Sequence, residues 1–310
     1  MVEPIALTAL AIDAAIGWPA ALYRRIGHPV NAFAAIIRWC ARRWNRGRAS
    51  ARRVVGIATV LILIAIAGGI GWGLTLLLDR LFAGWSWIGI ALLAAPGLAQ
   101  RSLFEHVRAV RDALAGSDLS GGRSAVAMIV GRDVEGLDEA SISRAAIESL
   151  AESFCDGIAA PLFWLLLLGL PGIWVYKAIN TADSLIGHRE APWRDFGWAA
   201  ARTDDLLNLI PARIAGPLIC VAAGRGWRVM WRDARKHASP NAAWTEAAMA
   251  GALGLRLAGP ASYDGEAHAK PWIGEGRADA GSVDISRALN LYLRACALLW
   301  VIAGVTAWAR

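Results

Sequence analysis

Three clusters of ionisable and amide side chains lie between residues 148 and 213, in a stretch otherwise made of long apolar runs. The first cluster is Glu148, Glu152 and Asp156, whose i, i+4 and i+8 spacing places three carboxylates on one helix face. Carboxylates hold cations and transfer protons. Beside membrane-like sequence they are costly to bury, so such groups pair, face water or perform a task.

The other two clusters also follow helical spacing. The second consists of Lys177, Asn180 and Asp183, and the third of Asp204, Asp205 and Asn208. Solvated helix faces and caps would explain any one cluster. Three of them close together among apolar runs favour a functional site.

The composition indicates an integral membrane protein with a substantial polar part. The 310 residues are 56% hydrophobic and 18% charged, against globular averages of roughly 45–50% and about 25%. The 16 Trp fit a membrane interface, although core packing explains some of them. The net charge of +7 comes mainly from Arg beside apolar runs, which the positive-inside rule explains better than nucleic-acid binding. Residues 24–53, with nine Arg and no acid, are expected on the cytoplasmic side.

The four cysteines are far apart and form no C-x-x-C and no Cys–His metal spacing. We therefore expect neither a disulfide framework nor a structural zinc site. The N-terminus lacks the basic region and the cleavage site of a signal peptide, so we expect it to be retained.

Apolar runs predict the membrane segments. Residues 54–78 form an uncharged run of 25 residues and are the clearest span, and 85–99 return as a shorter helix to complete a hairpin. Residues 4–22 just reach the length of a span but carry Asp13. The segments expected in the membrane are about 4–22, 54–78, 85–99, 158–178, 206–224 and 291–309.

Two of these segments contain helix breakers, Pro171-Gly172 within 158–178 and Pro211 within 206–224. If 158–178 crossed the bilayer fully, the later two clusters would lie opposite the first. We therefore favour broken or re-entrant helices that return to one side. The expected fold is all-α, a single polytopic bundle over 1–310 with about four to five membrane helices. Its polar segments 100–157, 179–205 and 225–290 are expected to be cytoplasmic.

Turn residues divide the first polar segment. Gly116 and Gly121-Gly122 are expected to break an amphipathic helix, and a second helix starts near Asp138. The loop between them contains Gly131-Arg132-Asp133, which is either an ordinary turn or a source of backbone N–H and guanidinium donors for phosphate. No P-loop motif occurs.

The polar segment 225–290 places His237 four residues after Asp233, so the carboxylate would orient the imidazole if a helix continues that far. Asn241 follows the Ser239-Pro240 turn, and residues 259–265 are expected to form a tight loop that presents Tyr263. No segment alternates polar and apolar residues with a sustained period of two.

The motifs together resemble the CobD/CbiB family of adenosylcobinamide-phosphate synthases, which are membrane proteins of cobalamin biosynthesis. The likeness covers almost the whole chain. Its ordered motifs are D-x-x-x-G-x-P at Asp13–Pro19, HPV at His28–Val30, SLFEH at Ser102–His106, MIVGRD at Met128–Asp133, ESLAES at Glu148–Ser153, DGIAAPLFW at Asp156–Trp164, AINTADSLIGH at Ala178–His188, FGWAAARTDDLLNLIPAR at Phe196–Arg213, HASPNAAWTEAAMAGAL at His237–Leu253 and GPASYDG at Gly259–Gly265.

The resemblance implies an ATP-dependent amide ligase of the bacterial inner membrane, with its active site on the cytoplasmic side. Its substrates would be adenosylcobyric acid and (R)-1-amino-2-propanol phosphate, or aminopropanol, and its product adenosylcobinamide phosphate. ATP would convert the carboxylate to an acyl phosphate with the help of Mg²⁺. The corrinoid is a substrate and not a prosthetic group. Other late corrinoid-pathway membrane enzymes are possible partners, besides the lipid bilayer, and nucleic acid is not expected.

The implied chemistry assigns roles to the clusters. Catalytic roles are expected for Asp183, Asp205, His237 and Glu152, with His188 as an alternative base. Substrate and phosphate contacts are expected from Lys177, Asn180, Arg202, Asn208, Arg213, Asn241, Tyr263 and His28. The expected Mg²⁺ ligands are Glu148, Glu152, Asp156 and Asp204.

The chain departs from the family pattern at two positions, with Ser153 where Asn is usual and Cys155 where Ser is usual. A non-catalytic sensor or scaffold of the same fold would show decay of the acidic and amide positions, most of which are present. A transporter would show spans repeated between two halves, and no internal repeat is found.

Overall fold

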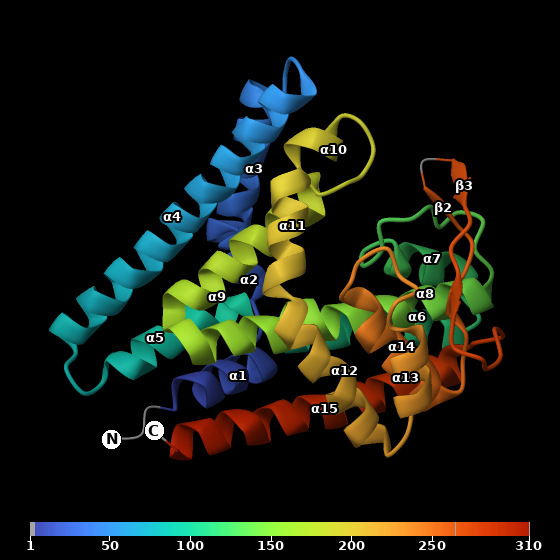
Figure 1. Cartoon of the computed structure of the whole chain (residues 1–310). Helices are drawn as coiled ribbons and strands as arrows, with labels where there is room; N and C mark the ends of the chain where they lie inside the picture. The colour runs from blue at the N-terminus through green and yellow to red at the C-terminus, as the bar shows by residue number, and fades with distance from the viewer. Residues whose placement is uncertain (1–3, 264, 310) are drawn as a thin grey trace. The chain divides into compact units, whose positions relative to one another are not determined.

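The structure is a computed structural model that describes residues 4–263 and 265–309, with only the backbone at 261–263, 267 and 268. The chain divides into two compact units whose segments alternate along the sequence. Unit 1 contains residues 1–99, 160–208 and 303–310, and unit 2 contains 100–159 and 209–302. Helices make up most of both units (Figure 1), which confirms the all-α prediction.

Unit 1 is helical in the residues that the structure describes. Its elements are α1 (Ile5–Ala15), α2 (Ala20–Ile26), α3 (Val30–Trp44), α4 (Ala49–Leu81), α5 (Ser86–Ala94), the short 3₁₀ helix η1 (Ala95–Gly97), α9 (Ala160–Ile186), α10 (Trp193–Phe196) and α11 (Trp198–Leu207).

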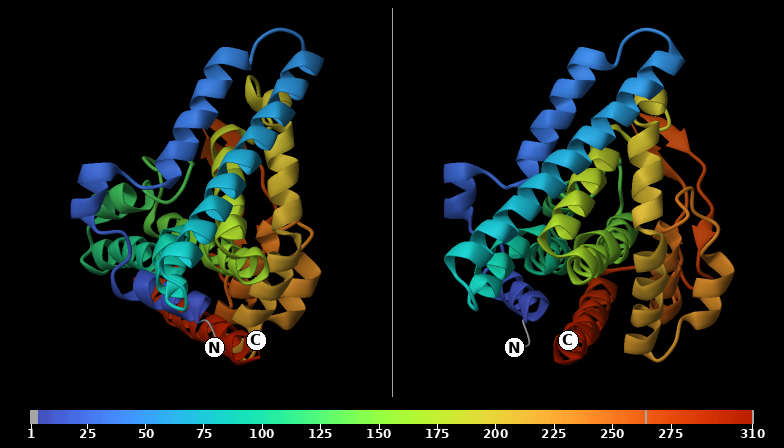
Figure 2. Two further views of the ribbon diagram at one scale, coloured as in Figure 1. Left: turned by 90° about the vertical axis from the view of Figure 1, so that its left-hand side faces the viewer. Right: turned by 60° about the vertical axis from the view of Figure 1, so that its left-hand side comes forward.

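The long helix α4 packs against α3, α9, α10 and α11. Figure 2 shows α3 and α4 side by side, joined by a short turn. Glycines allow the close approach: a Cβ at Gly56 would lie 2.0 Å from the carbonyl oxygen of Phe196, and one at Gly71 would lie 2.8 Å from the Cα of Pro171. An ion pair of 2.8 Å between Arg52 and Asp195 joins α4 to α10. These contacts fix α9 and α11, which carry the second and third clusters.

Unit 2 combines helices with two small antiparallel sheets. Its elements are α6 (Gln100–Ala115), α7 (Leu119–Val126), α8 (Glu139–Phe154), the π-helical turn η2 (Cys155–Ala159), α12 (Leu209–Ala223), α13 (Trp227–Asp233), α14 (Ala242–Leu253), β1 (Leu257–Ala258), β2 (Ala261–Tyr263), β3 (Glu266–His268), β4 (Trp272–Ile273) and most of α15 (Ser282–Trp308). Strand β1 pairs with β4, and β2 pairs with β3.

Helix α14 is the packing centre of unit 2, because it contacts α8, α12, α13 and the strands β1 and β4. Its sequence is rich in alanine, a strong helix former whose small side chain lets neighbouring helices approach. A Cβ at Gly251 would lie 3.0 Å from the carbonyl oxygen of Gly226, at the start of α13. Helix α14 is therefore surrounded by other elements of unit 2 on nearly every side.

Within the part of the chain that the structure describes, four helical segments are long and apolar enough to cross a membrane, and the number is up to six if each bent pair forms one span. The predicted run 54–78 lies inside α4, and 291–309 falls largely within α15, which begins earlier than expected. The other two segments are Ser86–Ala115 and Glu139–Ile186, and the bent pairs are Ile5–Ala15 with Ala20–Trp44 and Trp198–Leu207 with Leu209–Ala223.

The predicted helix breaks are present. Helix α9 is interrupted at Gly169, where φ is 66°, two residues before Pro171. Proline disfavours a helical conformation at the preceding residue and clashes with the carbonyl four residues back, so the break falls before it. A second break, at Asn208, separates α11 from α12.

Two local predictions were wrong. Gly121-Gly122 does not end a helix, because both lie inside α7, which Asp118 caps by accepting from the Gly121 N–H. The second concerns residues 259–265, expected as a loop: residues 257–273 contain four strands of two or three residues, which are too short to show a sustained period of two. The expected loop 259–265 is in part the hairpin of β2 and β3.

Candidate functional site

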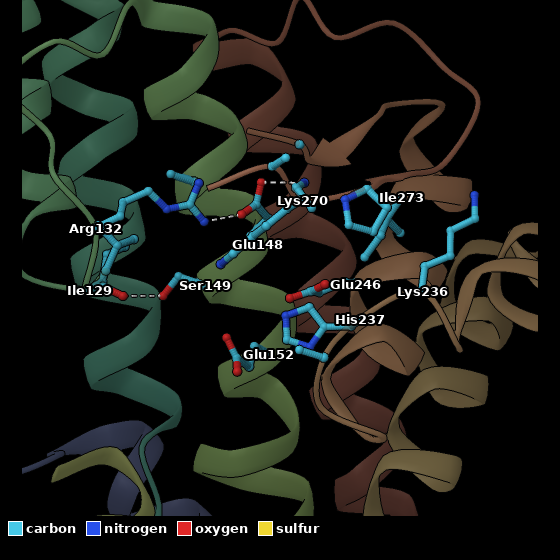
Figure 3. A pocket seen from close by; sticks show the side chains of 18 residues that line it. Ile129, Arg132, Glu148, Ser149, Glu152, Lys236, His237, Glu246, Lys270 and Ile273 are labelled. Atoms are coloured by element: carbon cyan, nitrogen blue, oxygen red, sulfur yellow. Dashed lines mark hydrogen bonds and ion pairs between the residues drawn. The ribbon is translucent and has the colours of Figure 1, made fainter. Parts of the chain in front are cut away.

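Unit 2 contains a cavity of about 540 Å³ lined by charged side chains from several segments of the chain. The segments are the loop after α7, helix α8, the turn between α13 and α14, helix α14, the end of β1 and the approach to β4. Its ionisable lining residues are Arg132, Glu148, Glu152, Lys236, His237, Glu246 and Lys270. Figure 3 shows Arg132 and Glu148 on one side of a common space and Glu246 and His237 on the other, whereas the Lys236 side chain extends away from it.

Glu148 joins three of these segments. One carboxylate oxygen pairs with Arg132, and the other accepts a hydrogen bond of 2.7 Å from the backbone N–H of Ala258 at the end of β1. Next to it, the Ser149 hydroxyl donates to the carbonyl of Ile129 at 2.8 Å. Ala258 has a positive φ of 57°, an uncommon conformation for a residue with a side chain. Glu148 therefore positions the walls of the cavity.

Glu246 is the least compensated charged group in this cavity. It lies on α14, its side chain is 4% exposed, and its Oε2 atom is buried without a hydrogen-bond partner. Burial, followed by the charges of Glu152 and Glu148, raises the pKa of Glu246 well above its usual value, while Arg132 and Lys270 oppose the shift. The cavity thus presents a buried carboxyl group with an unused oxygen.

The basic side chains of the cavity differ in how they are held. His237 accepts a hydrogen bond of 3.0 Å from the Ser239 N–H at Nδ1, so the neutral imidazole carries its proton on Nε2. Lys236 pairs with Asp233 at 2.8 Å. Lys270 lies on the segment before β4 and, with Arg132, acts electrostatically on Glu246.

Asp233 does not belong to a helix that includes His237, because α13 ends at Asp233. Its fully buried carboxylate binds Arg232, Lys236 and the backbone N–H of Gly274. Burial alone would raise the pKa of Asp233, but these hydrogen bonds lower it below its ordinary value. The condition for the predicted Asp233–His237 pair is therefore not met, and Asp233 instead anchors β4.

The second and third clusters meet within unit 1. Asn180 donates to one oxygen of Asp204 at 3.3 Å, and Asn208 donates to the other at 3.0 Å. The Tyr176 hydroxyl donates in turn to Asn208 at 3.0 Å. Asp183 and Asp205 lie close enough to act electrostatically on Asp204. The packing of α9 against α11 thus brings the two clusters into one polar site.

The other predicted substrate residues have diverse surroundings. Arg213 binds the Asn241 amide oxygen and lies over the Trp244 ring at 5.0 Å, and neither Arg213 nor Asn241 lines the cavity of about 540 Å³. His28 lies close enough to Lys177 for the two side chains to interact electrostatically. Arg202 forms an ion pair with Asp205 at 3.2 Å, and His188 is exposed in the segment after α9. The side chain of Tyr263 lies outside the described residues.

The predicted metal ligands do not all line the cavity. Glu148 and Glu152 do, whereas Asp156 lies in the π-helical turn η2 and is absent from the lining. Asp204 belongs to the site of unit 1. Among the residues that the structure describes, no three His, Cys, Asp or Glu side chains are grouped so that they could hold a metal ion. The departures Ser153 and Cys155 do not line the cavity.

Glu246, Lys236 and Lys270 were not among the site residues predicted from the sequence. A signal existed for Glu246, because it is the one charged residue in the sequence of α14. The two lysines stand in turn-rich sequence with no spacing that relates them to α8. Only the fold of unit 2 brings them to the carboxylates.

These features define a helical membrane protein with a charged cavity. The chain belongs to the CobD/Cbib protein family, whose model matches residues 6–292. The resemblance seen in the motifs is thereby confirmed.

The curated relatives match over nearly their whole length. A protein of Rhodobacter capsulatus named "Cobalamin biosynthesis protein CobD" is 48% identical over 306 residues, covering 97% of this chain and 96% of the relative. Proteins of the same name are 47% identical in a Sinorhizobium species, covering 94% of each chain, and 43% identical in Rhizobium meliloti, covering 95% and 94%. No solved structure matches the chain.

Proposed function

We propose that this chain acts in cobalamin biosynthesis as an ATP-dependent amide ligase, which joins a carboxyl group of adenosylcobyric acid to aminopropanol phosphate. The observation that carries the proposal is the cavity of unit 2, where basic side chains for phosphate lie beside a buried carboxyl group with an unused oxygen. The relatives' name supports the pathway. The amide-forming step is inferred from the chemistry of the cavity and from the family resemblance.

Arg132, Lys236 and Lys270 are the side chains that would bind phosphate oxygens. Each carries N–H donors, and guanidinium and ammonium groups bind phosphate through charge-assisted hydrogen bonds. ATP, when bound, would supply the phosphoryl group that activates the carboxylate. The donor set fits a nucleotide phosphate or a substrate phosphate.

Glu152 is the carboxylate that fits Mg²⁺ best. Both oxygens of Glu148 already bind other groups of the protein, and Glu246 is buried, whereas Glu152 is exposed in the wall of the cavity. Mg²⁺ usually binds through one or two carboxylates together with phosphate oxygens and water. The ion would then neutralise the charge that develops on the transferred phosphoryl group.

Glu246 and His237 would transfer protons during amide formation. The amine arrives as an ammonium ion and releases its first proton to water, while Glu246, which its raised pKa keeps protonated, would donate a proton to the departing phosphate. The free amine attacks the activated carbonyl, phosphate leaves, and His237 accepts the second proton from the new amide nitrogen. Asp183, Asp204 and Asp205 keep their predicted roles as proposals for the site of unit 1.

Product formation tests this function. Purified protein in detergent would receive adenosylcobyric acid, aminopropanol phosphate, Mg²⁺ and ATP, with mass spectrometry as the readout. We expect adenosylcobinamide phosphate only when ATP is present. Folded protein that yields no product, while a relative works in parallel, would favour the non-catalytic sensor or scaffold. The variant Ser153→Asn then shows whether that departure is responsible.

A further inference from the structure

A second cavity of unit 2, of about 420 Å³, is lined by three arginines and no carboxylate. Arg225 follows α12, while Arg287 and Arg294 lie on α15. The two α15 arginines are seven residues apart, which places them on one face of the helix. Asn290 lies between them, and Leu253 and Leu291 add an apolar wall.

The arginines are held in place by backbone carbonyl groups. Arg225 donates to the carbonyl of Ala252 at 2.7 Å, and Arg287 donates to that of Leu253 at 3.2 Å. Arg287 also pairs with Asp284 at 3.0 Å, but that carboxylate binds Arg277 more closely, at 2.6 Å. The carbonyls orient Arg225 and Arg287 without carrying a negative charge, and Asp284, which is shared with Arg277, offsets only part of the positive charge of the cavity.

Arg294 adds a charge without a partner among the residues that the structure describes. Its side chain is exposed, and it makes no ion pair with a described acid. It stands near the start of the apolar part of α15, a helix long enough to span a membrane. The exposed side chains of Leu293, Val301 and Ile302 lie on the same helix. This position is typical of the boundary between phospholipid headgroups and acyl chains.

We propose that this cavity binds the phosphate group of an anionic phospholipid, with Arg225, Arg287 and Arg294 as its donors. Basic pockets beside membrane helices bind acidic headgroups in this way, since guanidinium groups pair with phosphate through two parallel hydrogen bonds. The acyl chains would lie along the exposed apolar side chains of α15. The site is independent of the proposed ligase reaction, and a soluble phosphate compound is the other source of the same chemistry.

Lipid binding can be measured by native mass spectrometry of the purified full-length protein. Phosphatidylglycerol, phosphatidylcholine and inorganic phosphate would be titrated separately. We expect retention of phosphatidylglycerol, and about fivefold weaker binding of it in Arg294→Gln, as for the loss of one arginine at a membrane surface. Arg294 makes no ion pair, so the variant should keep the thermal stability of the wild type in detergent. Arg294→Lys should restore most of the binding.

The matched control is Arg228→Gln, which removes the same charge from an exposed position on α13 outside the cavity. It should bind phosphatidylglycerol as the wild type does. Equal binding of both lipids, or an equal loss in the two glutamine variants, would overturn the proposal. Displacement of the lipid by millimolar inorganic phosphate would assign the cavity to a soluble phosphate compound instead.

Discussion

Replacing Glu246 with glutamine removes a buried ionisable group while it keeps the size of the side chain. In the wild type, the Oε2 atom has no hydrogen-bond partner and the side chain is 4% exposed. Burial and the nearby carboxylates Glu152 and Glu148 raise the pKa of Glu246 above its usual 4.5. The folded protein therefore holds a proton on Glu246 at pH values where the unfolded chain has released it.

The sign of the pH dependence follows from this shift. The stabilising contribution of Glu246 is complete below pH 4.5 and is lost as pH rises toward the folded pKa. Within that window each pH unit costs the wild type on the order of 1 kcal/mol, and glutamine has no such cost. The wild type should therefore lose stability relative to Glu246→Gln as pH rises above 4.5, until the folded pKa is reached. A loss of about 1 kcal/mol corresponds to roughly 2 °C in Tm for a chain of this size.

Thermal unfolding in detergent across this pH range measures the effect. The difference in Tm between the variant and the wild type cancels the titration of all groups that the two proteins share. Glu190→Gln is the matched control, because Glu190 is exposed in the turn before α10. Its difference from the wild type should stay constant with pH. A constant difference for Glu246→Gln as well would refute a buried carboxyl group with a raised pKa.

Three further predictions concern packing, anchoring and topology. Gly56→Ala should lower Tm, because the new Cβ would lie 2.0 Å from the Phe196 carbonyl, while Gly69→Ala on the same helix meets nothing within 4 Å and should not. Asp233→Asn should destabilise the protein by on the order of 3 kcal/mol at neutral pH. The difference in stability between the wild type and Asp233→Asn should narrow once pH falls below 3.8, because the pKa of Asp233 is lowered in the folded protein. A difference that persists at low pH would contradict a lowered pKa for Asp233. A cysteine at position 190 should be labelled from the cytoplasmic side, and labelling only from outside would exclude re-entrant segments.

The sequence predicts the long apolar elements well, for a physical reason. An uncharged run such as 54–78 satisfies its backbone within one helix whatever its neighbours, so α4 could be located from composition. The breaks before Pro171 and at Asn208 follow from local proline geometry and were predicted to within a few residues. The spacing in α9 and α11 predicted a polar face on each helix, and the packing of the two helices then brings these groups together around Asp204.

The charged cavity was less predictable because it depends on tertiary contacts. Asp156 shares the helical spacing of Glu148 and Glu152 but lies in a π-helical turn, where that spacing no longer applies. Glu246 becomes unusual only through the burial of α14 among its neighbours. Lys270 reaches the cavity from a short β region whose strands are too brief to leave a pattern.

The cavity of unit 2 is the proposed place of ligation. The direct measurement is the rate of adenosylcobinamide phosphate formation by Glu152→Gln and by Glu190→Gln, which make the same change inside and outside the cavity. We predict a loss of at least about 100-fold for Glu152→Gln, as for removal of a group that stabilises developing charge. Glu190→Gln should retain the wild-type rate. Equal rates for both variants would contradict the assignment of this cavity as the active site.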